Sequence, residues 1–200
     1  MNGKPWDARL AYRLVYPLRD SWLTPNHLTS IRLLFGILAA TGLGTGDYFW
    51  SNIGALFFVV SNFLDHGDGE LARLTGKMSK NGHYFDLASD AIVNIALFIG
   101  IGTGLMHSQL GIWALFMGML SGLTIAGIFY MRNEIEKSIG KSDARQPNIG
   151  IIEAEDVLYL LPIVTLAGWL TPFLILASAG APVFALWTLK EYRVHRTKQS

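Results

Sequence analysis

Acidic residues inside apolar segments constrain this chain more than any other feature. The run D-H-G-D-G-E-L-A-R occupies residues 65–73, and Gly82, Asp86 and Asp90 follow it in the next apolar segment. A carboxylate at membrane depth costs several kcal/mol unless it is paired or binds a metal. The acids therefore predict a functional site inside a bundle of membrane helices. The alternatives, solvated loop charges or a buried ion-pair cluster, fit the apolar flanks and the regular spacing poorly.

Six membrane spans are predicted from the apolar segments. Residues 110–131 and 171–189 are uncharged and long enough to cross a hydrocarbon core of about 30 Å. Weaker spans are expected near 28–46, 49–73, 81–106 and 155–170. The second and third spans carry the acids, so we expect a hydropathy scan to underrate both. The predicted fold is an all-α integral membrane protein, with residues 1–200 forming one domain and residues 24–200 a six-helix bundle.

The basic residues predict the orientation of the spans. Of the sixteen Lys and Arg residues, fifteen lie before the first span, between spans two and three, between spans four and five, or after the sixth. The other three loops, near 44–50, 107–110 and 168–172, contain none. Basic loops stay on the cytoplasmic side. We therefore expect a multi-pass protein of the cytoplasmic (inner) membrane, with both termini and the active site on the cytoplasmic side.

The N-terminal segment, residues 1–23, is predicted to be an amphipathic interfacial helix. Residues 6–22 mix aromatic and aliphatic side chains with Arg and Asp, which is typical of a helix at headgroup level. A disordered basic tail is the alternative. Pro17 would kink or end the helix. Thr24 is a suitable N-cap for the first span, with Pro25 as its first residue.

Composition excludes several other classes of protein. A net charge of +1 is not the balance of a nucleic-acid-binding protein, and the absence of cysteine rules out disulfides and thiolate metal sites. Gly140-Lys141-Ser142 suggests a phosphate loop, but position 135, where that motif needs glycine, is Ile. Glycines spaced by four, at 100/104 and 118/122, permit close helix packing within the bundle or across a dimer, and internal packing is the preferred interpretation.

Helical geometry places the acids in two facing stripes. At 100° per residue, Asp65 and Asp68 share a face of the second span, and Asp86 and Asp90 share a face of the third. If the turn lies near residues 75–80, both stripes reach about 9–14 Å into the helices from the cytoplasmic end. The four carboxylates should therefore meet at one depth, where they cannot all stay ionised without cations.

The spacing of these residues resembles a known family signature. Written out, it is D-x2-D-G-x2-A-R-x8-G-x3-D-x3-D, and every specified position matches the signature of the CDP-alcohol phosphotransferases. These membrane enzymes make phospholipids by moving a phosphoalcohol from a CDP donor to an acceptor hydroxyl. The resemblance covers nearly the whole chain, and it also implies a homodimer.

The resemblance assigns a role to each signature residue. It implies that Asp65, Asp68 and Asp86 bind metal, and that Asp90 acts mainly as general base on the acceptor hydroxyl beside the metals. Oxygen ligands and a diphosphate substrate favour Mg²⁺ or Mn²⁺, with two divalent ions expected. The CDP part is assigned to Gly69, Ala72, Arg73 and Gly82. Glu70 points away from the acid stripe, and we expect it to be a surface charge.

A second motif in the first span also resembles the family. Asn26, Thr29 and Arg32 share one helix face and could reach the diphosphate. Asn26 could instead be a cap, and Thr29 could bond its own helix. Arg32 is harder to explain without a function, because it lies two turns into the span.

The expected reaction is transfer of a phosphatidyl group from CDP-diacylglycerol to a small polar alcohol, with release of CMP. In the alternative, the lipid is the acceptor. A soluble CDP-amino-alcohol then donates a phosphoethanolamine- or phosphocholine-type group to diacylglycerol or another lipid alcohol. Residues 153–156 (EAED), at the start of the fifth span, disfavour a phosphorylated acceptor, although acids also suit the first turn of any helix. A divalent-cation transporter or channel would need polar residues along a path to both faces, whereas the acids here gather toward the cytoplasmic side.

Overall fold

The described part of the chain consists of helices joined by short turns. The computed structural model describes residues 12–77, 79–139 and 158–197, and no strand occurs among them. The elements are η1 (Tyr16–Leu18), α2 (Pro25–Gly44), α3 (Tyr48–Thr75), α4 (Lys80–Gly104), α5 (Trp113–Ile139), α6 (Leu161–Leu166) and α7 (Leu170–Thr197). The all-α prediction is confirmed for these residues.

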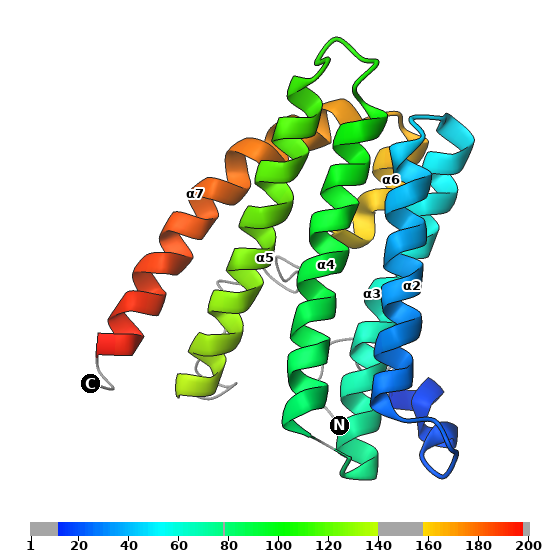
Figure 1. Cartoon of the computed structure of the whole chain (residues 1–200), viewed down its shortest axis with the longest axis vertical. Coiled ribbons are helices and arrows are strands. Elements are labelled where there is room, and N and C mark those ends of the chain that lie inside the picture. The colour runs from blue at the N-terminus through cyan, green and yellow to red at the C-terminus, as the bar shows by residue number, and fades with distance from the viewer. Residues whose placement is uncertain (1–11, 78, 140–157, 198–200) are drawn as a thin grey trace.

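The long helices run mainly along the longest axis of the molecule, with α7 inclined to the others (Figure 1). Helix α2 packs against both α3 and α4, α4 packs against α5, and α5 packs against α7. The short α6 contacts mainly α3. The α3–α4 turn, η1 and the C-terminal end of α7 all lie at one end of the bundle, at the bottom of Figure 1. Helix α2 therefore joins α3 and α4 into one group, and the α3–α4 turn lies at that end.

Within the described residues, four helices are long and apolar enough to cross a membrane: α2, α4, the Trp113–Ile135 part of α5, and the Leu170–Val194 part of α7. This supports a multi-pass membrane protein, while the count of six spans stays a prediction. Helix α3 is not among the four although its 28 residues extend for about 42 Å. The expectation that hydropathy underrates both acid-bearing spans is correct for α3 and wrong for α4, because the long apolar run after Asp90 outweighs its charges.

Helix ends follow the residues that favour them. Thr24 is the N-cap of α2 and Pro25 its first residue, as predicted, and the Thr24 backbone N–H donates to Nδ1 of His27. Ser79 caps α4 by accepting a 3.0 Å hydrogen bond from the Gly82 N–H. Gly76 ends α3 in the left-handed conformation, with φ of 65°. These caps place the α3–α4 turn where the sequence predicts it.

Two glycines show how closely the helices approach. A Cβ on Gly100 would lie 2.3 Å from the backbone oxygen of Ala40 in α2, and one on Gly118 would lie 2.3 Å from that of Phe98 in α4. Any larger side chain would push these backbones apart. The preferred interpretation of the spaced glycines, packing inside the bundle, is confirmed at both positions.

The ends of the chain are described only in part. Residues 12–15 are helical and continue into η1, which contains Pro17, and Val15 packs against Leu28 and Leu71. The rest of the predicted interfacial helix, residues 1–11, lies outside the described residues, as does 140–157 with the acidic run 153–156. Of the predicted fifth span, the described part contains only a short turn and α6.

Candidate active site

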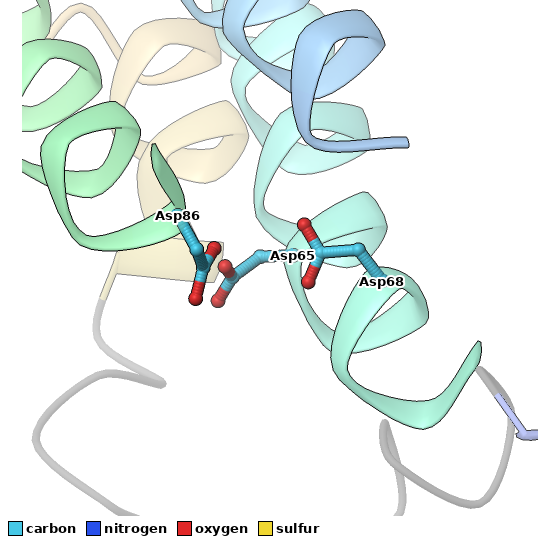
Figure 2. Close-up of side chains that lie close together, drawn as sticks. All are labelled: Asp65, Asp68 and Asp86. Atoms are coloured by element: carbon cyan, nitrogen blue, oxygen red, sulfur yellow. The ribbon is translucent and has the colours of Figure 1, made fainter. Parts of the chain in front are cut away.

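Three carboxylates of the predicted site come together between α3 and α4. One oxygen from each of Asp65, Asp68 and Asp86 lies within 4.8 Å of the others, which is close enough to share a metal ion. Figure 2 shows the Asp86 and Asp65 carboxylates facing each other, with that of Asp68 directed toward them from the next turn of α3. The two acid stripes therefore face each other as predicted.

Arg32 of α2, the third helix at the site, forms ion pairs with acids from both α3 and α4. Its Nη1 donates to Oδ1 of Asp65 and, at 2.8 Å, to Oδ1 of Asp86, while its Nη2 donates to Oδ1 of Asp90. The arginine side chain is only 3% exposed, whereas these three acids are 29–37% exposed. The guanidinium thus closes the inner side of the site, and the carboxylates remain open to an incoming ligand.

Two hydroxyls support this arrangement. Thr29 Oγ1 donates to Oδ2 of Asp68 at 2.7 Å and also contacts the backbone oxygen of Pro25 at 3.1 Å. Ser61 Oγ donates a 2.9 Å hydrogen bond to the backbone oxygen of Arg32. The side chains of Thr29, Asp68 and Ser61 are buried. Thr29 therefore both bonds its own helix and holds a carboxylate. Ser61 is not predictable from the sequence, because a lone serine in an apolar span carries no signal.

Asp90 lies one helical turn from Asp86 and is not part of the three-carboxylate group. One turn further along α4, Asn94 donates from Nδ2 to the backbone oxygen of Asp90 at 3.0 Å. Among the described residues, the buried Oδ1 of Asn94 has no hydrogen-bond partner. Asp90 thus lies beside the acid cluster and forms an ion pair with Arg32.

The remaining predicted residues lie around the cluster, toward the α3–α4 turn. A Cβ on Gly82 would lie 3.0 Å from Oδ1 of Asn26, so these two residues from α4 and α2 adjoin. Ala72 is half-buried on α3, and the Arg73 side chain is 52% exposed. The structure brings the two predicted motifs, one from α2 and one from α3 and α4, to one end of the bundle.

Glu70 differs from its prediction. It is 2% exposed, and its Oε1 accepts a 3.0 Å ion-paired hydrogen bond from Nη2 of Arg73. The expected surface charge is therefore wrong. Glu70 does lie away from the acid stripe. Its side chain is nevertheless buried, because other elements cover more than one face of α3.

The donor set fits a hard divalent cation. Its nearest ligand atoms are carboxylate oxygens, the ligands that Mg²⁺ and Mn²⁺ prefer, and the described residues contain no cysteine that would favour a softer ion. Four carboxylates face one guanidinium, so the site keeps an excess of negative charge that a cation would offset.

A sequence model of the family described as CDP-alcohol phosphatidyltransferase matches residues 22–191. The chain belongs to this family. The CDP-alcohol phosphatidyltransferases are phosphotransferases of phospholipid synthesis and are generally dependent on divalent metals, so the predicted family and enzyme class are confirmed.

Three relatives of this phosphatidyltransferase-family chain match over shorter stretches. Archaetidylinositol phosphate synthase of Pyrococcus horikoshii is 36% identical over 94 residues, 46% of this chain and 47% of the relative. The bifunctional IPC transferase and DIPP synthase of Archaeoglobus fulgidus is 37% identical over 79 residues, 40% of this chain and 15% of the relative. Ceramide phosphoethanolamine synthase of Drosophila melanogaster is 30% identical over 90 residues, 42% of this chain and 23% of the relative. The matches thus span about half or less of each relative.

Proposed function

We propose that this protein transfers a phosphatidyl group from CDP-diacylglycerol to a small polar alcohol and releases CMP. The observation that supports this best is the group of carboxylates from α3 and α4, enclosed by Arg32, in a chain that belongs to the phosphatidyltransferase family. The bundle supplies the apolar surroundings that a lipid donor needs, and the acids supply a place for its diphosphate and counter-ions.

Asp65, Asp68 and Asp86 are the proposed metal ligands, with Asp90 as a further ligand. Divalent cations, two in the full site, would offset the charge of the donor diphosphate and lower the pKa of the acceptor hydroxyl. Arg32 and Thr29 hold the carboxylates in place from α2. These contacts limit how far the acids move when a ligand binds.

Asp90 is the proposed general base. Its carboxylate takes the proton of the acceptor hydroxyl, whose oxygen then bonds to the phosphorus that carries the lipid. The bond from that phosphorus to the bridging oxygen breaks, and CMP leaves with the electron pair. Asp90 is suited to this role because it lies one turn deeper than Asp86, opposite the end of α3 that carries Arg73.

The CDP part is proposed to bind near the α3–α4 turn. Gly69, Ala72 and Gly82 are small residues that let a nucleotide approach the helix backbones. Arg73, with its half-exposed guanidinium, would pair with phosphate or contact the cytosine. Asn26 adjoins Gly82, and Thr29 and Arg32 follow it on α2. These positions support a nucleotide at the α3–α4 turn, the end proposed to face water, with the lipid along the bundle.

The alternative is transfer from a soluble CDP-amino-alcohol to a lipid alcohol such as diacylglycerol. One observation favours it. One relative is named ceramide phosphoethanolamine synthase, and the product in that name is a lipid that carries phosphoethanolamine. Another relative's name, archaetidylinositol phosphate synthase, describes an inositol phosphate lipid. The acidic run at 153–156 still favours a neutral or cationic acceptor.

The proposed setting is the cytoplasmic (inner) membrane, with both termini and the acids on the cytoplasmic side. The basic loops support this orientation, because the α3–α4 turn and the C-terminal end of α7 lie at the same end of the bundle (Figure 1). A homodimer is proposed from the family resemblance. Cysteine-accessibility labelling in intact cells would test the orientation, using single cysteines placed in a chain that has none.

The decisive experiment is a CMP-release assay on purified protein in lipid nanodiscs. CDP-diacylglycerol is offered with a panel of alcohols, and CDP-ethanolamine and CDP-choline are offered with diacylglycerol, each with Mg²⁺ or Mn²⁺. Mass analysis of the lipid product identifies the acceptor. We expect CMP and a new phospholipid, with loss of both in EDTA and recovery on adding the metal. If folded protein releases no CMP from any of these donors, the proposal is wrong.

A further inference from the structure

Glu70 is a buried acid that the proposed reaction does not use. It lies on α3 between the metal-binding acids and Arg73, with 2% of its surface exposed. Its Oε1 accepts a 3.0 Å hydrogen bond from Nη2 of Arg73, whose side chain is 52% exposed. The pair therefore has one partner inside the protein and the other at the surface, which is unlike a solvated surface ion pair.

The pairing directs Arg73 back along its helix. A Cβ on Gly69 would lie 3.6 Å from Nη2 of Arg73, in ordinary van der Waals contact. The guanidinium thus covers Gly69, which directly follows Asp68 in the chain. Figure 2 shows the Asp68 carboxylate directed toward the other two acids. The arginine head therefore lies about one turn deeper than its own backbone, adjacent to the turn that carries the acid cluster.

We infer that Glu70 is a positioning residue, which holds the Arg73 guanidinium over Gly69 in the orientation that receives the cytidine nucleotide. The inference rests on the proposed function, because it needs Arg73 to bind the CDP part. Glu70 itself does not contact the substrate. Its carboxylate fixes one nitrogen of the fork and leaves the other donors of the guanidinium for the ligand.

The physical reason is preorganisation. An exposed arginine samples many rotamers, and a ligand that binds it must offset that lost freedom. A buried carboxylate has few rotamers of its own, so it restricts the arginine before the nucleotide arrives. Because Nη2 is already held, removal of Glu70 should weaken nucleotide binding without changing the chemical step.

The test compares Glu70→Ala, Glu70→Gln, Arg73→Ala and the double variant Glu70→Ala/Arg73→Ala with the wild type. Calorimetry measures the Kd for CMP in the presence of Mg²⁺, and the nanodisc assay measures KM and kcat with CDP-diacylglycerol. Thermal melting reports the fold of each variant. Asp47→Ala is the matched control: it removes the acid that caps α3 by accepting from the Trp50 N–H, about 27 Å along the helix from Asp65.

We expect Glu70→Ala to raise the Kd for CMP and the KM for the donor about tenfold, equal to about 1.4 kcal/mol, with kcat within about twofold. Glu70→Gln keeps an oxygen acceptor and should lose less. Arg73→Ala should lose about 10- to 100-fold. The double variant should bind CMP no more weakly than Arg73→Ala, because the inferred effect of Glu70 on the nucleotide passes through that arginine. Asp47→Ala should lower the melting temperature and leave the Kd unchanged.

Several results would overturn the inference. One is a Glu70→Ala protein that melts lower but binds CMP as the wild type does, which indicates a purely structural pair. Tighter CMP binding would mean that Glu70 competes for Arg73, and losses that multiply in the double variant would mean independent roles. In each case a wild type that binds CMP leaves the proposed function standing. A folded wild type that binds neither CMP nor CDP-diacylglycerol refutes the proposed function itself.

Discussion

Thr29 on α2 donates a 2.7 Å hydrogen bond to the carboxylate of Asp68 on α3, and both side chains are buried. The contact joins two residues that are 39 positions apart in the chain. It attaches a proposed metal ligand to a helix that carries no acid of the cluster. Because Thr29 holds Oδ2 of Asp68, the Asp68 carboxylate stays directed toward Asp65 and Asp86 before any ion binds.

Replacing Thr29 with Val should therefore affect both stability and metal affinity. The change removes a hydrogen bond to a buried charged group, which is worth about 1.5–3 kcal/mol. We expect a lower melting temperature and a higher Mg²⁺ concentration for half-maximal turnover. Thr29→Ser keeps the hydroxyl and is the matched control. Equal Mg²⁺ dependence in the Val and Ser variants would show that the contact does not position Asp68.

Arg32→Ala should destabilise the protein most when no divalent ion is present. Without the guanidinium, Asp65, Asp86 and Asp90 lose their common cation, and carboxylates in close proximity repel one another. Breaking a buried pair costs about 3–5 kcal/mol. The melting temperature in EDTA should fall sharply, and Mg²⁺ should recover more of it than it adds to the wild type. The exposed Arg19, changed to Ala, is the control and should alter neither value.

Asp65→Asn, Asp68→Asn and Asp86→Asn should each abolish transfer and reduce the stabilisation that Mg²⁺ gives in thermal melting. Each change removes one negative ligand from the three-carboxylate group while keeping its shape. Asp47→Asn provides the control, because it changes an acid on the same helix outside the site. Near-normal activity of all three variants at limiting Mg²⁺ would exclude these residues as ligands.

Asp90→Asn should separate binding from chemistry. The variant keeps the side-chain shape, so donor and metal should still bind, while turnover falls about 10²–10⁴-fold, the range for loss of a general base. Calorimetry with the CDP donor, run beside the CMP-release assay, measures both. If donor binding falls as much as turnover, Asp90 is chiefly a metal ligand, and the base must be another group.

Much of the site could be predicted because helical periodicity is a local property. The spacing of Asp65 and Asp68, and of Asp86 and Asp90, places each pair on one face of its helix, and the turn between the helices sets their common depth. The structure confirms that the two faces meet. The predicted N-cap at Thr24 is likewise confirmed, since capping depends on a few neighbouring residues.

Glu70 shows what helical periodicity cannot predict. Its position away from the acid stripe could be read from the spacing, but its burial could not. Periodicity tells which residues share a face and says nothing about how many faces of a helix are covered. Helix α3 packs against α2, α6 and η1, so more than one of its faces is enclosed.

The order of residues was enough to specify helices that suit a membrane, the facing acids and the family, because each depends on spacing along the chain. The partners of Arg32, the hydrogen bond from Thr29 to Asp68, and the pairing of Glu70 with Arg73 inside the protein were decided by tertiary packing. The first two of these join residues of different helices, 33 to 58 positions apart in the chain. The third depends on which face of α3 is covered, so only the assembled bundle could establish them.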